Sequence, residues 1–359
     1  MSKIKKLSNF WKNKKVFITG HTGFKGTWLC IFLDILGAKV YGYSNHEKIS
    51  SFFYKKANIK KVIQKSINGD IRDYKKLKAS INKIKPQVLI HFAAQSLVRK
   101  SYMDPVTTYD VNIMGTVNIL NIVNEIKTIK SSLIITTDKV YHNDNKKKLF
   151  KENDKLGGND PYGNSKSCAD FIANFYISNF YKNKKSVAIV RSGNIIGGGD
   201  YAQDRIIPDF IRALKKNRSL KIRIPRAIRP WQHVMEPLYG YLLLAEKLYK
   251  SRNTNLSGAW NFGPNKKNNE TVIKMIRRLN CNFNNKVRII INKKPNQLYE
   301  SKILMLNSEK AKKQLSWNSL ISLSNAIKLT YEWYERAINS KDYLNITRNQ
   351  IVNYLKKIN

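Results

Sequence analysis

The side chains best suited to acid–base chemistry stand four residues apart in the segment PYGNSK. Tyr162 and Lys166 lie on one face of a helix that we expect to begin near Pro161. A nearby ammonium group lowers the pKa of a phenol, because it stabilises the phenolate. Such a phenolate can take a proton from a hydroxyl group near neutral pH, so the pair predicts a general base. The same spacing also arises by chance.

A second group of reactive side chains follows an expected strand at Leu133–Thr137. Thr137, Asp138 and Lys139 leave this strand at its carboxyl end, in the segment TTDKVY. Open α/β sheets bind their ligands at that edge, so an acid and a base placed there can act on one substrate. A surface ion pair or a β-turn is the alternative explanation for these residues.

Three glycines mark a third candidate site near the start of the chain. Gly20, Gly23 and Gly26 are spaced by three residues in VFITGHTGFKG, between an expected strand at Lys15–Thr19 and an expected helix at Gly26–Leu36. Glycines permit the tight turn and the close approach of a pyrophosphate, whose charge the helix amino terminus stabilises. An ordinary glycine turn is the weaker explanation, because strand, turn and helix come in the order of a dinucleotide-binding motif.

The second expected strand leaves the choice between NAD and NADP open. Its end, in VYGYSN, offers Ser44 and Asn45 to a ribose, where NAD-binding proteins commonly carry an acidic residue. Asp70, in the later segment GDIRD, could hydrogen-bond the adenine ring. A helix N-cap is an equally good role for this residue.

All these residues require a sheet that brings several strand ends together. Apolar, β-branched runs alternate with helical patterns through the first half of the chain. The expected strands are Lys15–Thr19, Lys39–Tyr43, Val88–His91, Leu133–Thr137 and Val187–Arg191, and the expected helices are Gly26–Leu36, Asn112–Ile126 and Pro161–Tyr181. This alternation predicts an α/β fold with a Rossmann-like, doubly wound parallel sheet and right-handed crossovers.

The pattern changes after Arg191, where glycine, proline and polar turns interrupt the chain. Shorter helices are expected at Pro208–Lys216, Pro237–Ser251, Asn269–Leu279 and Leu320–Ala337. We therefore expect a dinucleotide-binding domain over residues 1–192. Residues 193–359 would form a smaller, mostly helical substrate lobe, with some of this chain returning to the first domain. A chain of 359 residues is long enough for such a division.

The formal net charge of +42 is the feature that suggests a nucleic-acid partner. Lysine, asparagine and isoleucine are, however, abundant along the whole chain and are not gathered in one segment. Charge runs usually lie on solvated faces, so we expect neither nucleic acid nor a membrane as a partner. Anionic substrates would still be attracted to such a surface.

Composition also indicates the cellular compartment and whether a metal site is expected. Cys30, Cys168 and Cys281 are widely spaced, and the five histidines are dispersed, so no metal site is expected. The amino-terminal segment is charged without an apolar run behind it, and no apolar stretch is long enough to span a membrane. We expect a cytoplasmic protein with reduced cysteines.

The glycine turn, Thr137 and the Tyr-x-x-x-Lys spacing together resemble the extended short-chain dehydrogenases/reductases, the NAD-dependent epimerase/dehydratase family, over nearly the whole chain. Asp138 and Lys139 resemble the CDP-glucose 4,6-dehydratase family within it. Epimerases usually carry small or apolar residues at these positions, and dTDP-glucose dehydratases carry Asp-Glu. The strings GFKG, GGGD and RPWQHV strengthen this resemblance.

The resemblance implies conversion of CDP-D-glucose to CDP-4-keto-6-deoxy-D-glucose and water, an early step of deoxysugar synthesis for lipopolysaccharide O-antigen. Tyr162 would deprotonate the 4-hydroxyl group while a hydride leaves carbon 4 for NAD. Lys139 would remove the carbon-5 proton as a neutral base, and Asp138 would protonate the departing 6-hydroxyl group. The hydride would then return to carbon 6. Thr137 and Lys166 would complete the catalytic set.

The resemblance also implies two sets of binding residues. The cofactor would contact Gly20, Gly23, Phe24, Lys25, Gly26, Asp70, Ile71, Ala93, Ala94, Gln95, Asn112, Tyr162 and Lys166. The substrate would contact Gln95, Asn194, Arg205, Ile206, Arg229, Gln232 and Glu300. Asn194 and the guanidinium fork of Arg229 would hold the diphosphate, and Arg205 would line the nucleotide pocket. Both arginines could instead be ordinary surface residues. Gln95 departs from dTDP-sugar dehydratases, which carry glutamate there.

Other functions stay open at this level. A dTDP- or GDP-sugar dehydratase would use the same residues, whereas a nucleotide-sugar 4-epimerase would work without Asp138 and Lys139. A nucleic-acid binder, suggested by the charge alone, would bind DNA with a steep salt dependence. The family resemblance also implies a homodimer or homotetramer formed through the helices expected at Asn112–Ile126 and Pro161–Tyr181.

Overall fold

Seven parallel strands form the centre of the protein, whose computed structural model describes residues 3–45, 51–181, 185–251, 256–284, 286–291 and 298–358. The strands are β1 (Lys15–Thr19), β2 (Lys39–Ser44), β3 (Lys65–Asn68), β4 (Val88–His91), β5 (Ser131–Ile135), β6 (Ser186–Ser192) and β11 (Gly258–Phe262). Their order is β11-β6-β5-β4-β1-β2-β3. The predicted doubly wound sheet is therefore confirmed, and its strand order reverses between β1 and β4, where such sheets bind ligands.

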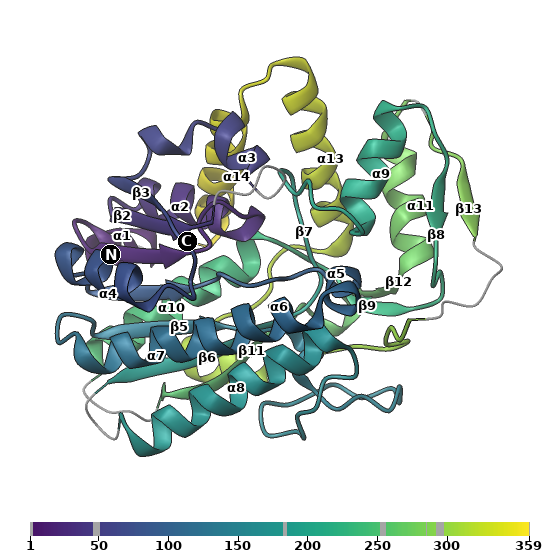
Figure 1. Ribbon diagram of the computed structural model, residues 1–359. Coiled ribbons are helices and arrows are strands. Elements are labelled where there is room, and N and C mark those ends of the chain that lie inside the picture. The colour runs from purple at the N-terminus through teal and green to yellow at the C-terminus, as the bar shows by residue number, and fades with distance from the viewer. Residues whose placement is uncertain are drawn as a thin grey trace.

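Helices cover both faces of this sheet (Figure 1). They are α1 (Lys3–Trp11), α2 (Phe24–Ile35), α3 (Phe52–Lys56), α4 (Tyr74–Ile84), α5 (Val98–Met103), α6 (Pro105–Tyr109), α7 (Gly115–Glu125), α8 (Pro161–Asn179), α9 (Ile206–Lys215), α10 (Met235–Lys250), α11 (Val272–Asn282), α12 (Glu309–Leu315), α13 (Leu323–Asn339) and α14 (Tyr343–Ile358). A π-helical turn, η2 (Asp110–Met114), joins α6 to α7. Short 3-10 turns are η1 (Ile59–Lys61), η3 (Asp138–Val140) and η5 (Lys266–Asn268).

Alternation along the strands divides the core into two layers, because successive side chains of a strand point to opposite faces. Phe17 and Ile134 pack with residues of α4, α7 and α8. Val16, Ile18 and Ile135 pack on the other face, with residues of α2, α10 and α14. Both faces of the sheet are thus buried, as expected of a parallel sheet.

The chain beyond β6 builds a second group of elements and also returns to the sheet. Short pairs of strands, β8 (Leu220–Ile222) with β13 (Ile289–Ile291) and β9 (Ile228–Pro230) with β12 (Asn269–Thr271), lie with α9 and α11 at the right of Figure 1. A further pair joins β7 (Ile195–Ile196) to β10 (Gln232–His233). β11 pairs with β6 and completes the sheet. The domain boundary at residues 192 and 193 stays a prediction.

Several element bounds differ from those expected. β5 ends at Ile135, because the side chain of Thr137 caps the 3-10 turn that follows. The helix expected at Asn112–Ile126 is a longer run that begins at Pro105 and contains the π-helical turn. The helix expected at Asn269–Leu279 begins only after β12, which pairs with β9.

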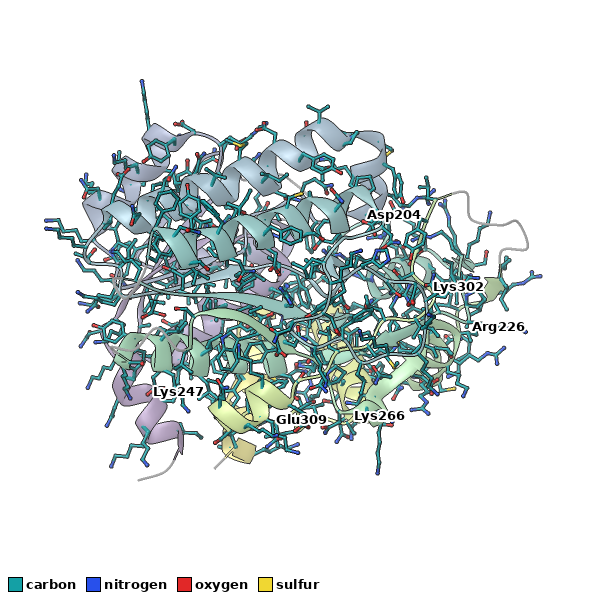
Figure 2. The ribbon with its side chains drawn as sticks, turned by 90° about the horizontal axis from the view of Figure 1, so that it is seen from below. Asp204, Arg226, Lys247, Lys266, Lys302 and Glu309 are labelled. Carbon is teal, nitrogen blue, oxygen red and sulfur yellow. The ribbon has the colours of Figure 1, made fainter. Side chains whose placement is uncertain are left out.

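Basic side chains are spread widely over the surface. In Figure 2, Lys247 lies near one end of the molecule and Arg226 near the other, with Lys266 and Lys302 in separate places between. The four labelled basic residues thus lie apart from one another, as expected of charge that is distributed along the chain, and the absence of a nucleic-acid partner stays a prediction. Within the described residues, no helix combines the length and apolar character that crossing a membrane requires.

Candidate active site

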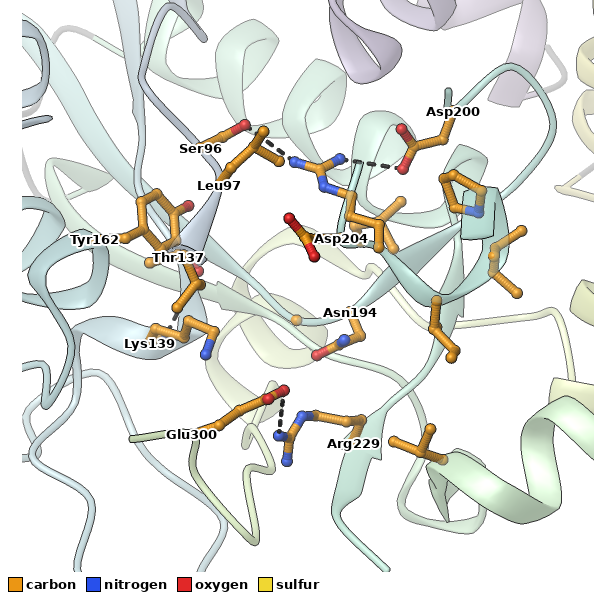
Figure 3. A pocket seen from close by; sticks show the side chains of 18 of the residues that line it. Ser96, Leu97, Thr137, Lys139, Tyr162, Asn194, Asp200, Asp204, Arg229 and Glu300 are labelled. Atoms are coloured by element: carbon orange, nitrogen blue, oxygen red, sulfur yellow. Dashed lines mark hydrogen bonds and ion pairs between the residues drawn. The ribbon is translucent and has the colours of Figure 1, made fainter. Parts of the chain in front are cut away.

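A cavity of about 290 Å³ opens beside the carboxyl ends of the central strands. In Figure 3, Thr137, Lys139 and Tyr162 line one side, and Asn194, Arg229 and Glu300 lie across from them. The sequence-predicted residues that line it are Phe24, Lys25, Thr137, Asp138, Lys139, Tyr162, Asn194, Arg205, Ile206, Arg229 and Glu300. The fold thus gathers residues that are up to 276 positions apart, counted from Phe24 to Glu300, around one space.

The segment after β5 presents an acid and an amine to this cavity. Thr137 is the N-cap of η3, and its hydroxyl group donates a hydrogen bond to Oδ1 of Asp138 at 3.1 Å. Asp138 is only 3% exposed, and within the described residues its Oδ2 atom lacks a hydrogen-bond partner. Burial raises the pKa of Asp138 to about 6, against the opposing charges of Lys139 and Arg229. This carboxyl group can therefore hold a proton close to neutral pH.

Helix α8 supplies the second half of the acid–base set. Its first turn has Pro161 at N1, and the backbone N–H of Tyr162 donates to Oγ of Ser101 at 3.0 Å. Burial raises the pKa of Tyr162 to about 12, although a hydrogen bond to Thr137 and the charge of Arg205 lower it. In the protein alone the phenol pKa is therefore raised, because desolvation outweighs these contacts, and the lowering expected with a bound nicotinamide cation stays a prediction.

Lys166 lies one helical turn beyond Tyr162 and is 2% exposed. Burial, and repulsion from Lys25, lower the pKa of Lys166 to about 8, while Asp170 acts in the opposite direction. An amine that is readily deprotonated stabilises a nearby phenolate less than a permanent cation does. A cationic nicotinamide ring held beside Tyr162 would supply the missing positive charge.

The glycine turn after β1 fits a dinucleotide. Gly20 has a φ of +72°, and a Cβ atom there would lie 2.7 Å from the backbone nitrogen of Ala93, so glycine is required. A Cβ atom on Gly26 would lie 2.3 Å from the Gly20 carbonyl oxygen. The same atom on Gly23 would make an ordinary contact at 3.5 Å, so the fold itself does not require glycine at this N-cap of α2. The open space beside Gly23, with the unpaired N–H groups of a helix start, suits a pyrophosphate.

Asp70 lies in the loop after β3 and forms an ion pair with Arg72 at 2.6 Å. The N-cap of α4 is Asp73, so the alternative role of Asp70 as a helix cap is wrong. Ser44, at the end of β2, exchanges a hydrogen bond of 2.8 Å with Thr22. Ile71 is buried behind this loop, and Ala93 lies against Gly20. Ala94 follows in the same loop after β4.

Gln95 and Asn112 hold the loop after β4 in place. The Asn112 amide nitrogen donates to the Gln95 carbonyl at 3.0 Å and to Oγ of Ser165 at 2.9 Å. The Gln95 side chain bonds to Leu97 and Thr108. Gln95 is not among the residues that line the cavity, and internal hydrogen bonds occupy its amide group, so its contact with the substrate stays a prediction.

The substrate side of the cavity carries cations that are already paired with acids. Arg229 is 3% exposed and lies 3.4 Å from Oε1 of Glu300. Arg205 lies 3.1 Å from Asp200. Lys25, expected on the cofactor side, faces the cavity, and burial with repulsion from Arg205 lowers its pKa to about 8.

Two expected substrate contacts lie differently with respect to the cavity. Gln232 is fully buried, donates to the Phe262 carbonyl at 2.7 Å, and is not among the residues that line the cavity. Its position is explained by packing between β10 and β11. Ile206, at the start of α9, does line the cavity.

Sequence reasoning missed several charged residues at this site. Asp160 caps α8 and lies 3.5 Å from Nζ of Lys139. Asp204 lies 3.5 Å from Arg99 and 3.3 Å from Arg223, and all three line the cavity. An aspartate immediately before proline at a helix start could have been recognised as a cap. The Asp204 pairs have no local sequence signal, because they join three separate segments.

Together, the doubly wound sheet, the glycine turn and the tyrosine and lysine on α8 define an extended short-chain dehydrogenase/reductase. A profile of the family described as GDP-mannose 4,6 dehydratase matches residues 17–330. A CDP-glucose 4,6-dehydratase from Salmonella typhimurium is 38% identical over 353 residues, which are 97% of this chain and 98% of that protein. The chain therefore belongs to this family of dehydratases, and the resemblance read from the sequence is confirmed.

Solved structures agree on the fold. A dTDP-glucose 4,6-dehydratase from Bacillus anthracis in complex with NAD has a TM-score of 0.75 at 22% identity, covering 93% of this chain and 99% of that one. A UDP-glucose 4-epimerase from Stenotrophomonas maltophila with bound NAD has a TM-score of 0.80 at 18% identity, covering 91% and 100%. At these identities the comparisons support the architecture, and the chemistry must come from the site.

Proposed function

We propose that this protein is an NAD-dependent hydro-lyase that converts CDP-glucose to CDP-4-keto-6-deoxyglucose and water. The observation that carries the proposal is the position of Asp138 and Lys139, which face the same cavity as Tyr162. A buried carboxyl group whose pKa is raised to about 6 is protonated in part of the molecules just below neutral pH, and it can serve as an acid beside an amine that serves as a base. Elimination of water requires both groups, whereas epimerisation at carbon 4 requires neither.

The first step is oxidation at carbon 4. Tyr162 accepts the proton of the 4-hydroxyl group, and its contact with Thr137 orients the phenol. The bound nicotinamide supplies the acceptor for the hydride of carbon 4 and the donor of a hydride to carbon 6. Lys166 and Lys25 add positive charge around this end of the cavity, which favours the phenolate while they are protonated.

Elimination follows, because a ketone at carbon 4 acidifies the hydrogen on carbon 5. Lys139 removes this proton, and the electron pair forms a double bond to carbon 6. The bond from carbon 6 to its oxygen breaks, and Asp138 gives its proton to that oxygen, so that water leaves. The raised pKa of Asp138 keeps this proton available. Lys139 then gives its proton back to carbon 5 while carbon 6 receives the hydride that the bound nicotinamide would return. Asp138 takes a new proton from solvent, and Tyr162 releases the proton that it took from the 4-hydroxyl group.

Arg229 and Asn194 are placed to hold the diphosphate. The Arg229 guanidinium is nearly buried, and Glu300, its present partner, is 30% exposed at the side chain. A diphosphate can therefore replace Glu300 and offer a stronger, bidentate contact. CDP is favoured over other nucleotides by the near full-length similarity to the Salmonella typhimurium enzyme, which is named for CDP-glucose. NAD is favoured by the glycine turn and by the NAD named in the two structural relatives.

The test is a panel of CDP-, dTDP-, GDP- and UDP-hexoses incubated with the purified protein and NAD. We expect loss of one water from CDP-glucose, seen by mass, and an alkaline absorbance typical of a 4-keto-6-deoxy sugar. NADP in place of NAD should reduce the rate. An unchanged mass with inversion at carbon 4 would identify an epimerase and remove the roles given to Asp138 and Lys139.

We also propose that two copies associate through α5, α6, α7 and α8. Large apolar side chains are exposed on these elements or directly beside them: Met103, Val106, Met114, Phe171, Phe175 and Phe180 are 48–78% exposed. α7 and α8 lie side by side on one face of the molecule (Figure 1). Exposed apolar patches of this kind commonly mark subunit interfaces.

Sedimentation tests this association. The unmodified protein should sediment as a dimer or tetramer, and Phe175→Glu should shift it to a monomer. Leu320→Glu is the matched control, since Leu320 is also about half exposed but lies before α13. Monomeric behaviour of the unmodified protein at micromolar concentration would contradict the proposed interface.

A reducing compartment such as the cytoplasm is our further proposal. Cys30 is buried, Cys168 partly buried and Cys281 exposed, and all three are free thiols. An exposed free thiol persists best where the surroundings keep it reduced.

A further inference from the structure

We propose that Asp160 is the positioning residue for Lys139 and sets the direction from which this amine approaches the hydrogen on carbon 5. Asp160 is the N-cap of α8, with its side chain 3% exposed, and its two carboxylate oxygens have different partners. Oδ1 accepts the backbone N–H of Gly163 at 2.8 Å, whereas Oδ2 lies 3.5 Å from Nζ of Lys139. The inference rests on the proposed function, because it concerns the base of that reaction.

The first turn of α8 is pressed closely against the segment that carries Lys139. A Cβ atom on Gly163 would lie 2.9 Å from the Lys139 carbonyl oxygen and 3.4 Å from its Cβ atom. Glycine at position 163 therefore permits close packing of α8 on the Lys139 segment, because any side chain there would force the two segments apart. One turn later, Oγ of Ser167 donates to the carbonyl of Val140 at 2.8 Å. The backbone on both sides of the Lys139 carbonyl is thus fixed by α8.

The backbone contacts leave the long side chain of Lys139 free to rotate, and the ion pair with Asp160 removes that freedom. The Lys139 side chain is 17% exposed, so solvent alone does not determine where its amine lies. Charged groups around it are Asp138 on its own segment, Asp160 on α8, and Arg229 on β9. The Glu300 carboxylate lines the same cavity, but it is paired with Arg229. Among the described residues, Asp160 is the ion-pair partner of Lys139, and it draws the amine toward α8 and away from Asp138.

The chemistry of a neutral amine explains why such an acceptor is useful. A neutral amine has two N–H donors and one lone pair. The ion pair holds the ammonium group beside Asp160. In the neutral amine that removes the proton, an N–H accepted by the same carboxylate would restrict rotation about the last side-chain bond and leave the lone pair to face the cavity. Tyr162 follows Asp160 by two residues in the same turn, so one helix start positions the groups that act at carbon 4 and at carbon 5.

Two substitutions separate this role from helix capping. Asp160→Asn keeps an acceptor for the cap but removes the charge. Asp160→Ser also keeps a cap, and its side chain is too short to reach Lys139. The matched control is Asp104→Asn, because Asp104 caps α6, precedes a proline, and accepts the N–H of Thr107 at 3.1 Å in the same geometry. Asp104 is not among the residues that line the cavity.

The readout is turnover of CDP-glucose with hydrogen or deuterium at carbon 5. We expect both Asp160 variants to keep KM within about twofold and to lose roughly 10- to 100-fold in kcat, as for a misplaced catalytic group. The deuterium effect on kcat should rise in both variants, because removal of the carbon-5 proton becomes the slow step. Asp104→Asn should match the unmodified enzyme in all three quantities.

The outcomes distinguish the two proposals. If the unmodified enzyme does not dehydrate CDP-glucose or any other nucleotide sugar, the proposed function fails, and with it the role of Asp160. If it does, but the Asp160 variants show an unchanged deuterium effect, the positioning role alone is overturned, whatever their kcat. Thermal melting of each variant shows separately whether the cap is kept, and both variants should melt close to the unmodified enzyme.

Discussion

Two clusters of buried charge lie next to each other at the end of β5, and they differ in how completely their polar groups are hydrogen-bonded. The first, here called the Arg191 network, consists of Thr136, Tyr141, Asp170, Arg191 and Asn261. The Arg191 guanidinium donates to both carboxylate oxygens of Asp170, at 2.8 and 2.6 Å, and to the Tyr141 hydroxyl group at 2.9 Å. Tyr141 in turn donates to Asn261 at 2.7 Å. Buried charges that are paired and bonded in this way hold a fold together.

The second, here called the catalytic cluster, consists of Thr137, Asp138, Lys139, Tyr162 and Lys166. It is similarly buried but less completely bonded. Oδ2 of Asp138 lacks a partner within the described part of the chain, and burial is the main cause of the shifted pKa values of Asp138, Tyr162 and Lys166. Both clusters are thus buried, and they differ in how many of their polar atoms are hydrogen-bonded. A polar group left partly unbonded is the one available to a substrate.

The largest expected effect is the loss of catalysis when the acid is removed. Asp138→Asn should lower kcat by about 100- to 10,000-fold, the usual contribution of a general acid, because asparagine cannot protonate the departing oxygen. Steady-state turnover of CDP-glucose measures this, with circular dichroism to show that the fold is kept. A variant with normal turnover would mean that another group acts as the acid.

The matching substitution in the Arg191 network should lower the stability of the protein and not the rate of its chemical step. Asp170→Asn leaves the Arg191 charge buried without its carboxylate, which costs about 3–5 kcal/mol of unfolding free energy. Urea denaturation measures the loss. Glu125→Gln is the control, because its ion pair with Lys78 is exposed and contributes little to stability. Equal losses in the two variants would contradict the contrast between the clusters.

The next largest effect is a pH dependence of the free energy of unfolding that arises from Asp138 in the catalytic cluster. Because the pKa of Asp138 is raised in the folded protein, from 3.8 to about 6, its contribution to stability is present below about pH 4 and is lost as the pH rises through 6. The unmodified protein should therefore lose about 3 kcal/mol relative to Asp138→Asn between pH 4 and pH 7.

Urea unfolding of both proteins across this pH range gives the difference directly. Glu236, whose pKa burial raises to about 7, titrates in both proteins and cancels in the comparison. A difference that stays constant with pH would show that the Asp138 carboxyl group is charged in the folded protein.

The smallest expected effect compares two nearly buried arginines. Arg191 is held by Asp170, Tyr141 and the Glu152 carbonyl. Among the described residues, Arg229 bonds to the adjacent Ile228 carbonyl at 3.0 Å and to a single carboxylate, that of Glu300, at 3.4 Å. Arg229→Lys should raise KM for CDP-glucose roughly tenfold, because lysine loses the bidentate contact with the diphosphate. Its melting temperature should change little, whereas Arg191→Lys should lower it clearly. Reversal of these two results would place the structural role at Arg229.

The sequence by itself determined the features that depend on neighbours along the chain. The bounds of β1 and β4 and the start of α8 at Pro161 match expectation, because apolar runs, turns and caps are local signals. The glycine turn and the spacing of Tyr162 and Lys166 are likewise local, as is the adjacency of Asp138 and Lys139. These features sufficed to predict the sheet and the family.

Tertiary structure alone decided which of these groups are bonded and which are left available. The Gln95 amide bonds within its own loop, and the Gln232 amide nitrogen bonds to β11, whereas Oε1 of Gln232 lacks a partner among the described residues. The substrate contacts expected of both residues stay predictions. Asp160 and Lys139 are 21 positions apart in the sequence, and Arg229 and Glu300 are 71 positions apart, so no local sequence pattern predicts either pair. The direction of the Tyr162 pKa shift also depends on how deeply the fold buries it. Burial and hydrogen bonding between distant segments are properties of the packed chain, and they fix the chemistry that the local motifs make possible.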